Sequence, residues 1–175
     1  MKNILLFVGA ALVIASCHSK NYSEVMNVNQ QRFGGWQLDN ARFLNESYDL
    51  VLLVGDMSTL AEKRSQLKES YLLATDASKN AKSLHFNYKM EAMRLRVRLT
   101  SELSSSQDEY LQQLNTISEE NFDMMYVYCM KTKLEELELK MEAYTANGKN
   151  ERLVELADEV QDSFRSLNEG LSQIK

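Results

Sequence analysis

The stretch from Asn121 to Tyr144, NFDMMYVYCMKTKLEELELKMEAY, has a sustained helical pattern, and a shorter helical segment beginning at residues 104–106 precedes it. Its apolar side chains recur every three or four residues, at Phe122, Tyr126, Met130, Leu134, Leu137, Met141 and Tyr144. That spacing places them on one face of an α-helix, and such a face needs other elements to bury it. The stretch therefore predicts a long helix around which the other segments pack.

The composition of the 175-residue chain favours helix throughout. There is no proline, only six glycines occur, and 44% of the residues are hydrophobic, which suffices for a sizeable core. The formal net charge is −5, and it becomes −6 without the first sixteen residues, which contain one lysine and no acid. Because the chain is acidic and has no nucleic-acid-binding motif, we expect no nucleic-acid partner.

Three further segments have amphipathic spacing. The first is expected to begin at a cap on Asp39 or Asn40 and to end near residue 64, and the second covers about residues 66–93. The last begins after an Asn150 cap and has the most regular apolar face, formed by Leu153, Ala157, Val160, Phe164, Leu167, Leu171 and Ile174. Helices of this kind bury their faces by packing at about 20°. The predicted fold of residues 39–175 is an all-α, antiparallel four-helix bundle.

Residues 1–16 have the pattern of an export signal. A basic residue precedes a twelve-residue apolar run (4–15), which is too short to span a membrane and is typical of a signal peptide. The ending IASC at residues 14–17 resembles a bacterial lipoprotein lipobox, so we expect cleavage between Ser16 and Cys17 and a lipid, including palmitate, on Cys17. Several acyl chains would hold the protein on a membrane. The alternative is an ordinary secreted protein in which Cys17 is incidental.

Residues 17–38 are predicted to be the lipid attachment site and a flexible linker. The segment is rich in Ser, Asn and Gln, contains a pair of glycines and has no sustained period. Phe33 and Trp36 dock loosely on the domain in this interpretation, and the alternative places them at the membrane surface. The residues after Cys17 are not acidic, and by resemblance to other lipoproteins nothing there indicates retention in the inner membrane. We expect a lipid-anchored envelope protein on the outer membrane, facing the periplasm.

Residues 94–99 alternate basic and apolar side chains, RLRVRL. A period of two over so short a run predicts an extended connector with its apolar side chains turned inward. Arg94, Arg96 and Arg98 would then form a basic patch for an anionic lipid, a glycan or an acidic partner. The alternative is a solvated loop surface, because three charges make a weak electrostatic site.

Three anchors along the chain resemble a known family. They are Ala92 through Leu99-Thr100-Ser101-Glu102-Leu103, then Phe122-Asp123-Met124-Met125-Tyr126, and then the helix containing Leu156 and Ala157. On these anchors, residues 41–174 are similar to an exported bacterial ferritin-like family of unknown function, whose members are often labelled outer-membrane proteins. The resemblance implies a ferritin-like four-helix bundle in which Phe122, Asp123 and Tyr126 form a structural motif. It implies no activity, because the family has none firmly assigned.

The chain departs from the family pattern at four positions. Relatives usually carry histidines in the second, third and fourth helices, and counting along the anchors places those positions at Ala81, Leu134 and Leu167 here. Thr100 stands where a proline is usual after the connector. If the histidines bind a metal in relatives, this chain has lost that site.

Few residues in the sequence are candidates for metal binding or catalysis. The two histidines, His18 and His85, do not form the Glu-x-x-His pairs of di-iron bundles. A copper(I) site could use soft sulfur donors, although core packing is the favoured interpretation of these side chains; they are Met124, Met125, Cys129 and Met130. We therefore expect no metal, no cofactor and no enzymatic activity.

These patterns together predict a non-catalytic interaction or structural module on the cell envelope. Its partners would be the membrane, through the lipid on Cys17, and an envelope protein or glycan, through Arg94, Arg96 and Arg98. The alternative is a metal- or cofactor-binding bundle.

Overall fold

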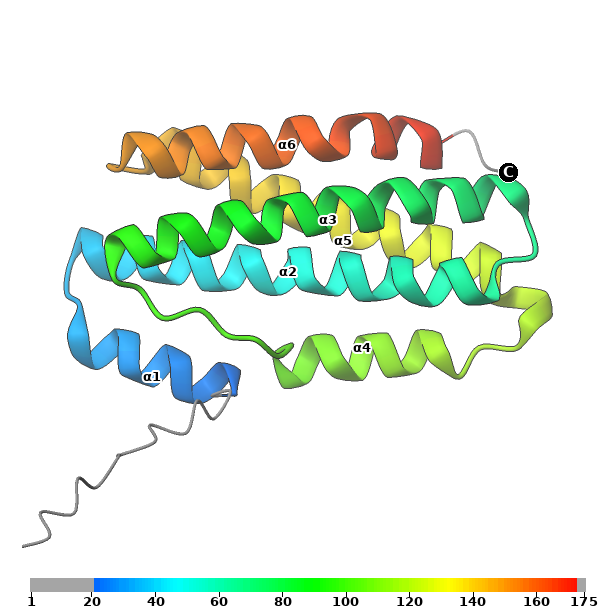
Figure 1. Cartoon of the computed structure of the whole chain (residues 1–175), viewed down its shortest axis with the longest axis horizontal. Coiled ribbons are helices and arrows are strands. Elements are labelled where there is room, and N and C mark those ends of the chain that lie inside the picture. The colour runs from blue at the N-terminus through cyan, green and yellow to red at the C-terminus, as the bar shows by residue number, and fades with distance from the viewer. Residues whose placement is uncertain (1–20, 173–175) are drawn as a thin grey trace, which may run out of the picture.

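The computed structural model describes residues 21–172, which are all-helical and contain no strand (Figure 1). Predicted features at residues 1–20 and 173–175, among them the signal, Ser16, Cys17 and Ile174, lie outside the described residues. The six helices are α1 (Tyr22–Arg32), α2 (Trp36–Arg64), α3 (Lys68–Leu95), α4 (Ser105–Asn115), α5 (Glu119–Asn147) and α6 (Glu151–Leu171).

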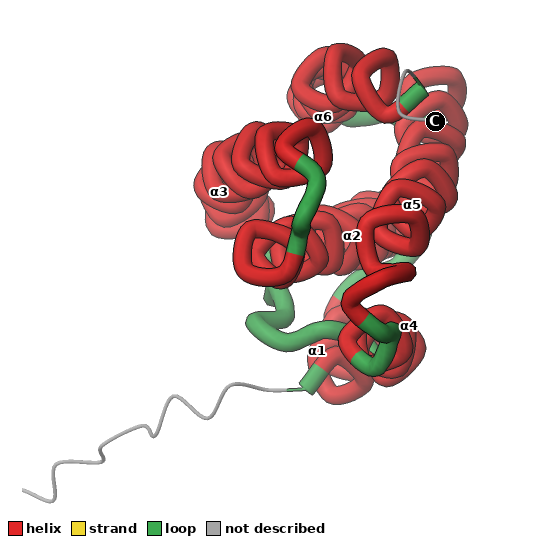
Figure 2. Tube along the Cα trace, turned by 90° about the vertical axis from the view of Figure 1, so that its right-hand side faces the viewer, coloured by secondary structure: helices red, strands yellow, loops and turns green. Residues whose placement is uncertain are grey.

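The four long helices, α2, α3, α5 and α6, lie side by side, and the short helices α1 and α4 cover one side of this group (Figure 2). Helix α2 packs against α3 and α5, and α6 packs against the same two helices. Since α2 and α6 run in one direction and α3 and α5 in the other, these neighbouring pairs are antiparallel (Figure 1). The consecutive long helices α3 and α5 are parallel, and the connector 96–104 with α4 carries the chain back between them.

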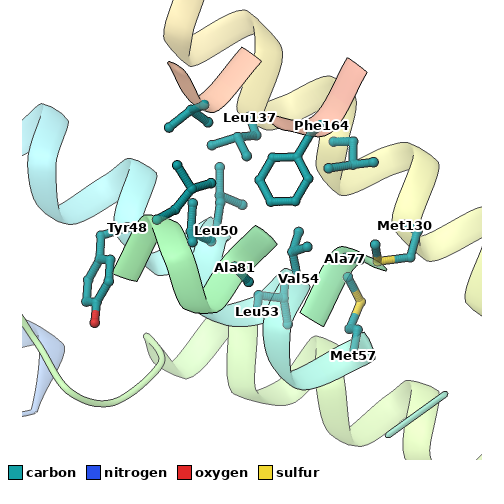
Figure 3. Packing of buried hydrophobic residues seen from close by; sticks show 14 of the residues in the cluster. Tyr48, Leu50, Leu53, Val54, Met57, Ala77, Ala81, Met130, Leu137 and Phe164 are labelled. Atoms are coloured by element: carbon teal, nitrogen blue, oxygen red, sulfur yellow. The ribbon is translucent and has the colours of Figure 1, made fainter. Parts of the chain in front are cut away.

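The core lies between the long helices, and Figure 3 shows part of it. The predicted face of α5 is confirmed, since six of its seven members are buried and Tyr144 packs partly buried against them. The predicted face of α6 is confirmed as far as Leu171. In Figure 3, Leu137 and Phe164 approach Leu50 and Val54 across the core. Apolar periodicity therefore identified the surfaces that pack.

Helix α2, rather than α5, buries the largest number of its residues. It packs against α1, α3, α4 and α5, and about half of its 29 residues are buried. Because it is covered on more than one face, it also buries polar side chains such as Asn45 and Asp49, which an amphipathic pattern does not predict. Gly55 lets α3 approach closely, since a Cβ at this position would lie 3.2 Å from that of Ala81.

The structure corrects the linker expected at residues 17–38. Residues 22–32 form α1, which begins at an Asn21 cap whose side chain accepts the N–H of Glu24, at 3.0 Å. Helix α2 begins at Trp36, not after a cap on Asp39 or Asn40. The sequence showed no period here because α1 buries only Val25 and a polar residue, Asn29.

The two aromatic residues at the junction between α1 and α2 lie in different environments. Phe33 is half-buried and packs against the core, with the Arg32 guanidinium 5.4 Å from its ring centroid. Trp36, in the first turn of α2, remains 48% exposed. Phe33 therefore docks on the helices as predicted, whereas Trp36 remains about half exposed.

Candidate interaction surface

The basic patch expected at Arg94–Arg98 is divided between a helix and a loop. Arg94 lies in the last turn of α3 and forms a 2.5 Å ion pair with Glu91, which corrects its placement in an extended connector. Arg96 ends the helix in the left-handed conformation, with φ 56°. Beyond it the alternation holds, because Val97 is buried and Arg98 is exposed.

Helix α1 holds the connector backbone in place. The side chain of Asn29 donates to the carbonyl of Arg98 at 2.8 Å and accepts the N–H of the same residue at 3.1 Å. Asn45 of α2 donates to that carbonyl at 3.0 Å, and Arg32 donates to the carbonyl of Arg96 at 3.0 Å. The exposed side chains of Arg96 and Arg98 therefore project from a fixed backbone.

The outer face of α3 carries a second group of exposed residues, which we call the α3 stripe. Phe86, Met90 and Met93 are 63%, 44% and 66% exposed, and their spacing of four and three places them on one helix face. Three exposed lysines share this face, so the stripe consists of Lys79, Lys82, Phe86, Lys89, Met90 and Met93. It is distinct from the buried face of α3, which contains Leu84, Tyr88 and Ala92.

Charge is concentrated on this part of the molecule. Residues 79–98 contain six basic side chains and one acidic one, a net charge of +5 in a chain whose formal net charge is −5. The single acid, Glu91, is ion-paired with Arg94. Arg94, Arg96 and Arg98 follow the α3 stripe along the chain, so this segment is basic throughout.

The α3 stripe was not predicted from the sequence. The signal was present in the spacing of Phe86, Met90 and Met93. A helix that packs on one side needs only one apolar face, so a second one with lysines beside it indicates a surface for a partner.

The family motif at the start of α5 ties two turns to the bundle. Asp123 is 8% exposed, and its Oδ2 accepts the backbone N–H groups of Gln66, at 2.9 Å, and Leu67, at 3.1 Å. These donors lie at the turn between α2 and α3, where the N-terminal amides of α3 have no partners within the helix. The buried carboxylate therefore acts as a cap supplied by another helix.

The two aromatic residues of the motif are completely buried. Phe122 lies under the guanidinium of Arg64, whose carbon is 4.4 Å from the ring centroid. Arg64 also donates to the carbonyls of Asn115, at 2.6 Å, and Ile117, where α4 ends. Burial raises the pKa of Tyr126 far above its usual value. The arrangement of Phe122, Asp123 and Tyr126 thus supports a structural function.

His85 is a half-buried side chain on α3. Tyr48 of α2 hydrogen-bonds its Nδ1 atom, and burial, together with the nearby charge of Lys89, lowers the pKa of the imidazole. The Tyr48 hydroxyl and the imidazole share one hydrogen bond, so the pair satisfies a polar group at the edge of the core.

The sulfur-containing residues of α5 do not converge on one point. Met124 is 66% exposed, whereas Met130 is completely buried in the core (Figure 3). Cys129 is buried beside Tyr110 of α4, and it contributes to raising the pKa of that phenol after burial itself. No group of three or more His, Cys, Asp or Glu side chains that could hold a metal ion occurs within residues 21–172.

The three positions at which the resemblance implies histidines in relatives lie inside the core. Ala81, Leu134 and Leu167 are 6%, 3% and 2% exposed and belong to the same apolar cluster. Thr100 uses its backbone N–H, which proline lacks, to donate to Asn45 at 3.3 Å. The residues present at these four positions therefore contribute apolar packing and one hydrogen bond.

A groove of about 440 Å³ lies between α5 and α6. Its floor is formed by nearly buried apolar side chains, including Leu134 and Phe164, and its rim carries Glu138, Glu142 and Arg165. None of its lining residues is a histidine or cysteine.

None of the helices within residues 21–172 is long and apolar enough to cross a bilayer.

Comparison of the chain with known proteins finds no matching curated protein and no matching solved structure. The model of one protein family, described as a domain of unknown function (DUF4142), matches residues 29–174. This range includes α2 to α6, the connector and Asn29 of α1. Because the match covers most of the sequence, the chain belongs to the DUF4142 family.

Proposed function

We propose that this protein is a lipid-anchored component of the bacterial cell envelope that acts as a non-catalytic interaction module. In this proposal a ferritin-like four-helix bundle supplies the scaffold, Cys17 carries the lipid, and Arg94, Arg96 and Arg98 contact an anionic partner. The observation that carries the proposal is the fixed connector, which presents two of the three arginines on a backbone held by Asn29 and Asn45.

Helix order supports the ferritin-like part of the proposal. Ferritin-like bundles differ from simple up-and-down bundles in having one long crossover connection. Here α2 and α3 form one antiparallel pair and α5 and α6 form the other, while α4 and the connector make a crossover along the bundle between them (Figure 1). Ala81, Leu134 and Leu167 belong to the apolar core, which fits a ferritin-like protein that uses its bundle only as a scaffold.

The short distance along the chain from Cys17 to the first described residue supports a function close to the membrane. Four peptide units separate Cys17 from Asn21, and even fully extended they span at most about 14 Å. A lipid on Cys17 would therefore keep α1, and the connector to which Asn29 and Arg32 bind, close to the bilayer surface.

The lipid anchor is tested by replacing Cys17 with alanine in cells that express the full chain. We expect the wild type to incorporate a clickable palmitate analogue and to sediment with membranes, whereas Cys17→Ala loses the label and accumulates as the uncleaved precursor. Cys129→Ala is the matched control, and it should label as the wild type does because its thiol is buried. Label remaining on Cys17→Ala would contradict the anchor.

The partner surface is tested by changing Arg94, Arg96 and Arg98 together to glutamine. We expect cross-linked complexes in the intact envelope to disappear, because Arg96 and Arg98 are exposed and their backbone contacts do not involve their own side chains. The circular dichroism spectrum and the denaturation midpoint should change little. The control changes Lys63, Lys149 and Arg152, three exposed cations elsewhere, to glutamine. Unchanged cross-linking in the arginine variant would refute this surface.

The alternative of a metal- or cofactor-binding bundle lacks a comparable observation. The sulfur atoms of Met124, Cys129 and Met130 lie in different surroundings, and the core positions of the family's histidines are apolar. We therefore propose no cofactor for the protein.

A further inference from the structure

We propose that the α3 stripe binds the surface of an anionic lipid bilayer, so that α3 lies along the membrane. The lipid on Cys17 belongs to the proposed function and serves here only to bring a membrane close. The stripe itself consists entirely of described residues on one helix, and all six are exposed. Figure 2 shows that α3 lies at the outside of the group of long helices.

The apolar half of the stripe is suited to the interface between lipid headgroups and acyl chains. Phe86 and Met93 expose about two-thirds of their surface, and Met90 lies between them on the same face. Large apolar side chains gain free energy when they leave water, and three at a helical spacing can enter a bilayer together. Flexible methionines also adapt to an irregular surface such as a headgroup layer.

The basic half of the stripe is suited to lipid phosphates. Lys79, Lys82 and Lys89 are exposed, and none forms an ion pair within residues 21–172. Lysine side chains beside inserted apolar residues can extend to the headgroups, which is the pattern of helices that lie in the membrane interface. Arg96 and Arg98, which follow α3 along the chain, are exposed cations as well.

Acidic side chains border the stripe without dividing it. Asp76 precedes Lys79 by one turn, Glu91 is paired with Arg94, and Glu159 of α6 accepts a hydrogen bond from Asn87 at the contact between α3 and α6. Glu159 thus places an acid at the contact with α6, whereas Lys79, Lys82 and Lys89 are on the exposed face of α3.

A comparison with α5 supports a charged membrane as the occupant. Helix α5 also exposes large apolar side chains, since Met124, Tyr128 and Leu139 are 66%, 62% and 66% exposed. Acids accompany them, however, among them the exposed Glu135 and Glu138. An anionic bilayer attracts α3 and repels α5, so charge selects between two faces of similar apolar exposure.

With the lipid anchor in place, the α3 stripe would need only a weak affinity for the bilayer to remain bound to it. Binding of the stripe becomes intramolecular once Cys17 is in the bilayer, and short connections of this kind correspond to effective concentrations in the millimolar range. The stripe would therefore set the orientation of the bundle on the membrane, while the acyl chains keep the protein there.

The test uses the mature chain, beginning at residue 17, with Cys17→Ser so that no lipid is attached. Its sedimentation with vesicles of phosphatidylglycerol and phosphatidylethanolamine is compared with that on neutral phosphatidylcholine vesicles. We expect binding to the anionic vesicles only. Changing Lys79, Lys82 and Lys89 to glutamine should weaken binding roughly 100-fold, because each cation near an anionic surface contributes about a fivefold factor. Changing Phe86, Met90 and Met93 to serine should weaken it at least about tenfold.

Two variants serve as matched controls for charge and for exposed apolar surface. Lys63→Gln, Lys149→Gln and Arg152→Gln together should change the affinity by no more than a few fold. The triple variant that places serine on α5 should bind as the wild type does; it combines Met124→Ser, Tyr128→Ser and Leu139→Ser. The proposal is overturned if the wild type ignores anionic vesicles, binds neutral ones equally, or loses as much affinity through the control changes. Such a failure would leave the lipid anchor intact, because palmitate labelling of Cys17 tests that separately.

Discussion

Replacing Asp123 by alanine is expected to lower the free energy of unfolding by about 3 kcal/mol. A charge-assisted hydrogen bond contributes roughly 1.5 to 3 kcal/mol, and the two that are lost here share one carboxylate, so their contributions do not simply add. The side chain is almost buried, and it pairs the N–H groups of Gln66 and Leu67 at the start of α3. Without the carboxylate, both donors lose their protein partner and the turn between α2 and α3 loosens. Urea denaturation of the mature chain, followed by circular dichroism, measures the change.

Two further substitutions test whether the lost stability comes from the hydrogen bonds of the Asp123 carboxylate. Asp76→Ala removes an exposed aspartate of α3 for which the structure shows no hydrogen bond, so its effect should remain within about 0.5 kcal/mol. Asp123→Asn keeps an acceptor oxygen but removes the charge, and it should cost less than Asp123→Ala. If Asp123→Ala were as stable as Asp76→Ala, the family motif would not hold the turn.

Apolar periodicity predicts the long helices because their stability comes from burying one face. Leu153 to Leu171 on α6 is the clearest case, since the helix has a core on one side and solvent on the other. Asn150 caps α6 as expected, with its side chain accepting the N–H of Leu153 at 3.3 Å. The match to a family of unknown function covers residues 29–174, a range that includes the residues 41–174 over which the anchors predicted membership of such a family.

The attachments of loops and short helices could not be predicted in the same way. They depend on buried polar side chains whose partners are far away in sequence, and a polar residue in a helix looks solvent-exposed until its partner is known. Asp49 of α2 accepts the N–H of Ser104 at the start of α4, at 2.9 Å, and burial raises its pKa despite this bond. Asn29 and Asn45 bind the connector in the same manner. The linker expected at residues 17–38 was wrong over α1 for this reason.

The apolar spacing also could not predict the crossover between α3 and α5, because spacing within a helix does not determine its direction relative to the next helix. Four stripes are compatible with an up-and-down bundle and with a crossover bundle alike. The α3 stripe, in contrast, was visible in principle at Phe86, Met90 and Met93. It was overlooked because Leu84, Tyr88 and Ala92 already explained why the segment is helical.

Replacing Asn29 by alanine is expected to detach α1 while the long helices remain folded. Asn29 is 1% exposed and supplies both a donor and an acceptor to the backbone of Arg98. Its removal leaves the N–H of Arg98 without a partner and takes away a main contact of α1, which otherwise buries only Val25. Losing two such hydrogen bonds costs about 2 to 3 kcal/mol, which corresponds to a rise in amide exchange of α1 on the order of 50-fold.

Hydrogen–deuterium exchange on the mature chain measures this effect helix by helix. The amides of α1 and of the connector should exchange faster, whereas those of α5 and α6 should retain their protection, because neither helix contacts Asn29 through a hydrogen bond. Asn27→Ala is the matched control, since Asn27 is an exposed residue of the same helix. Equal protection of α1 in both variants would show that α1 is held by other contacts.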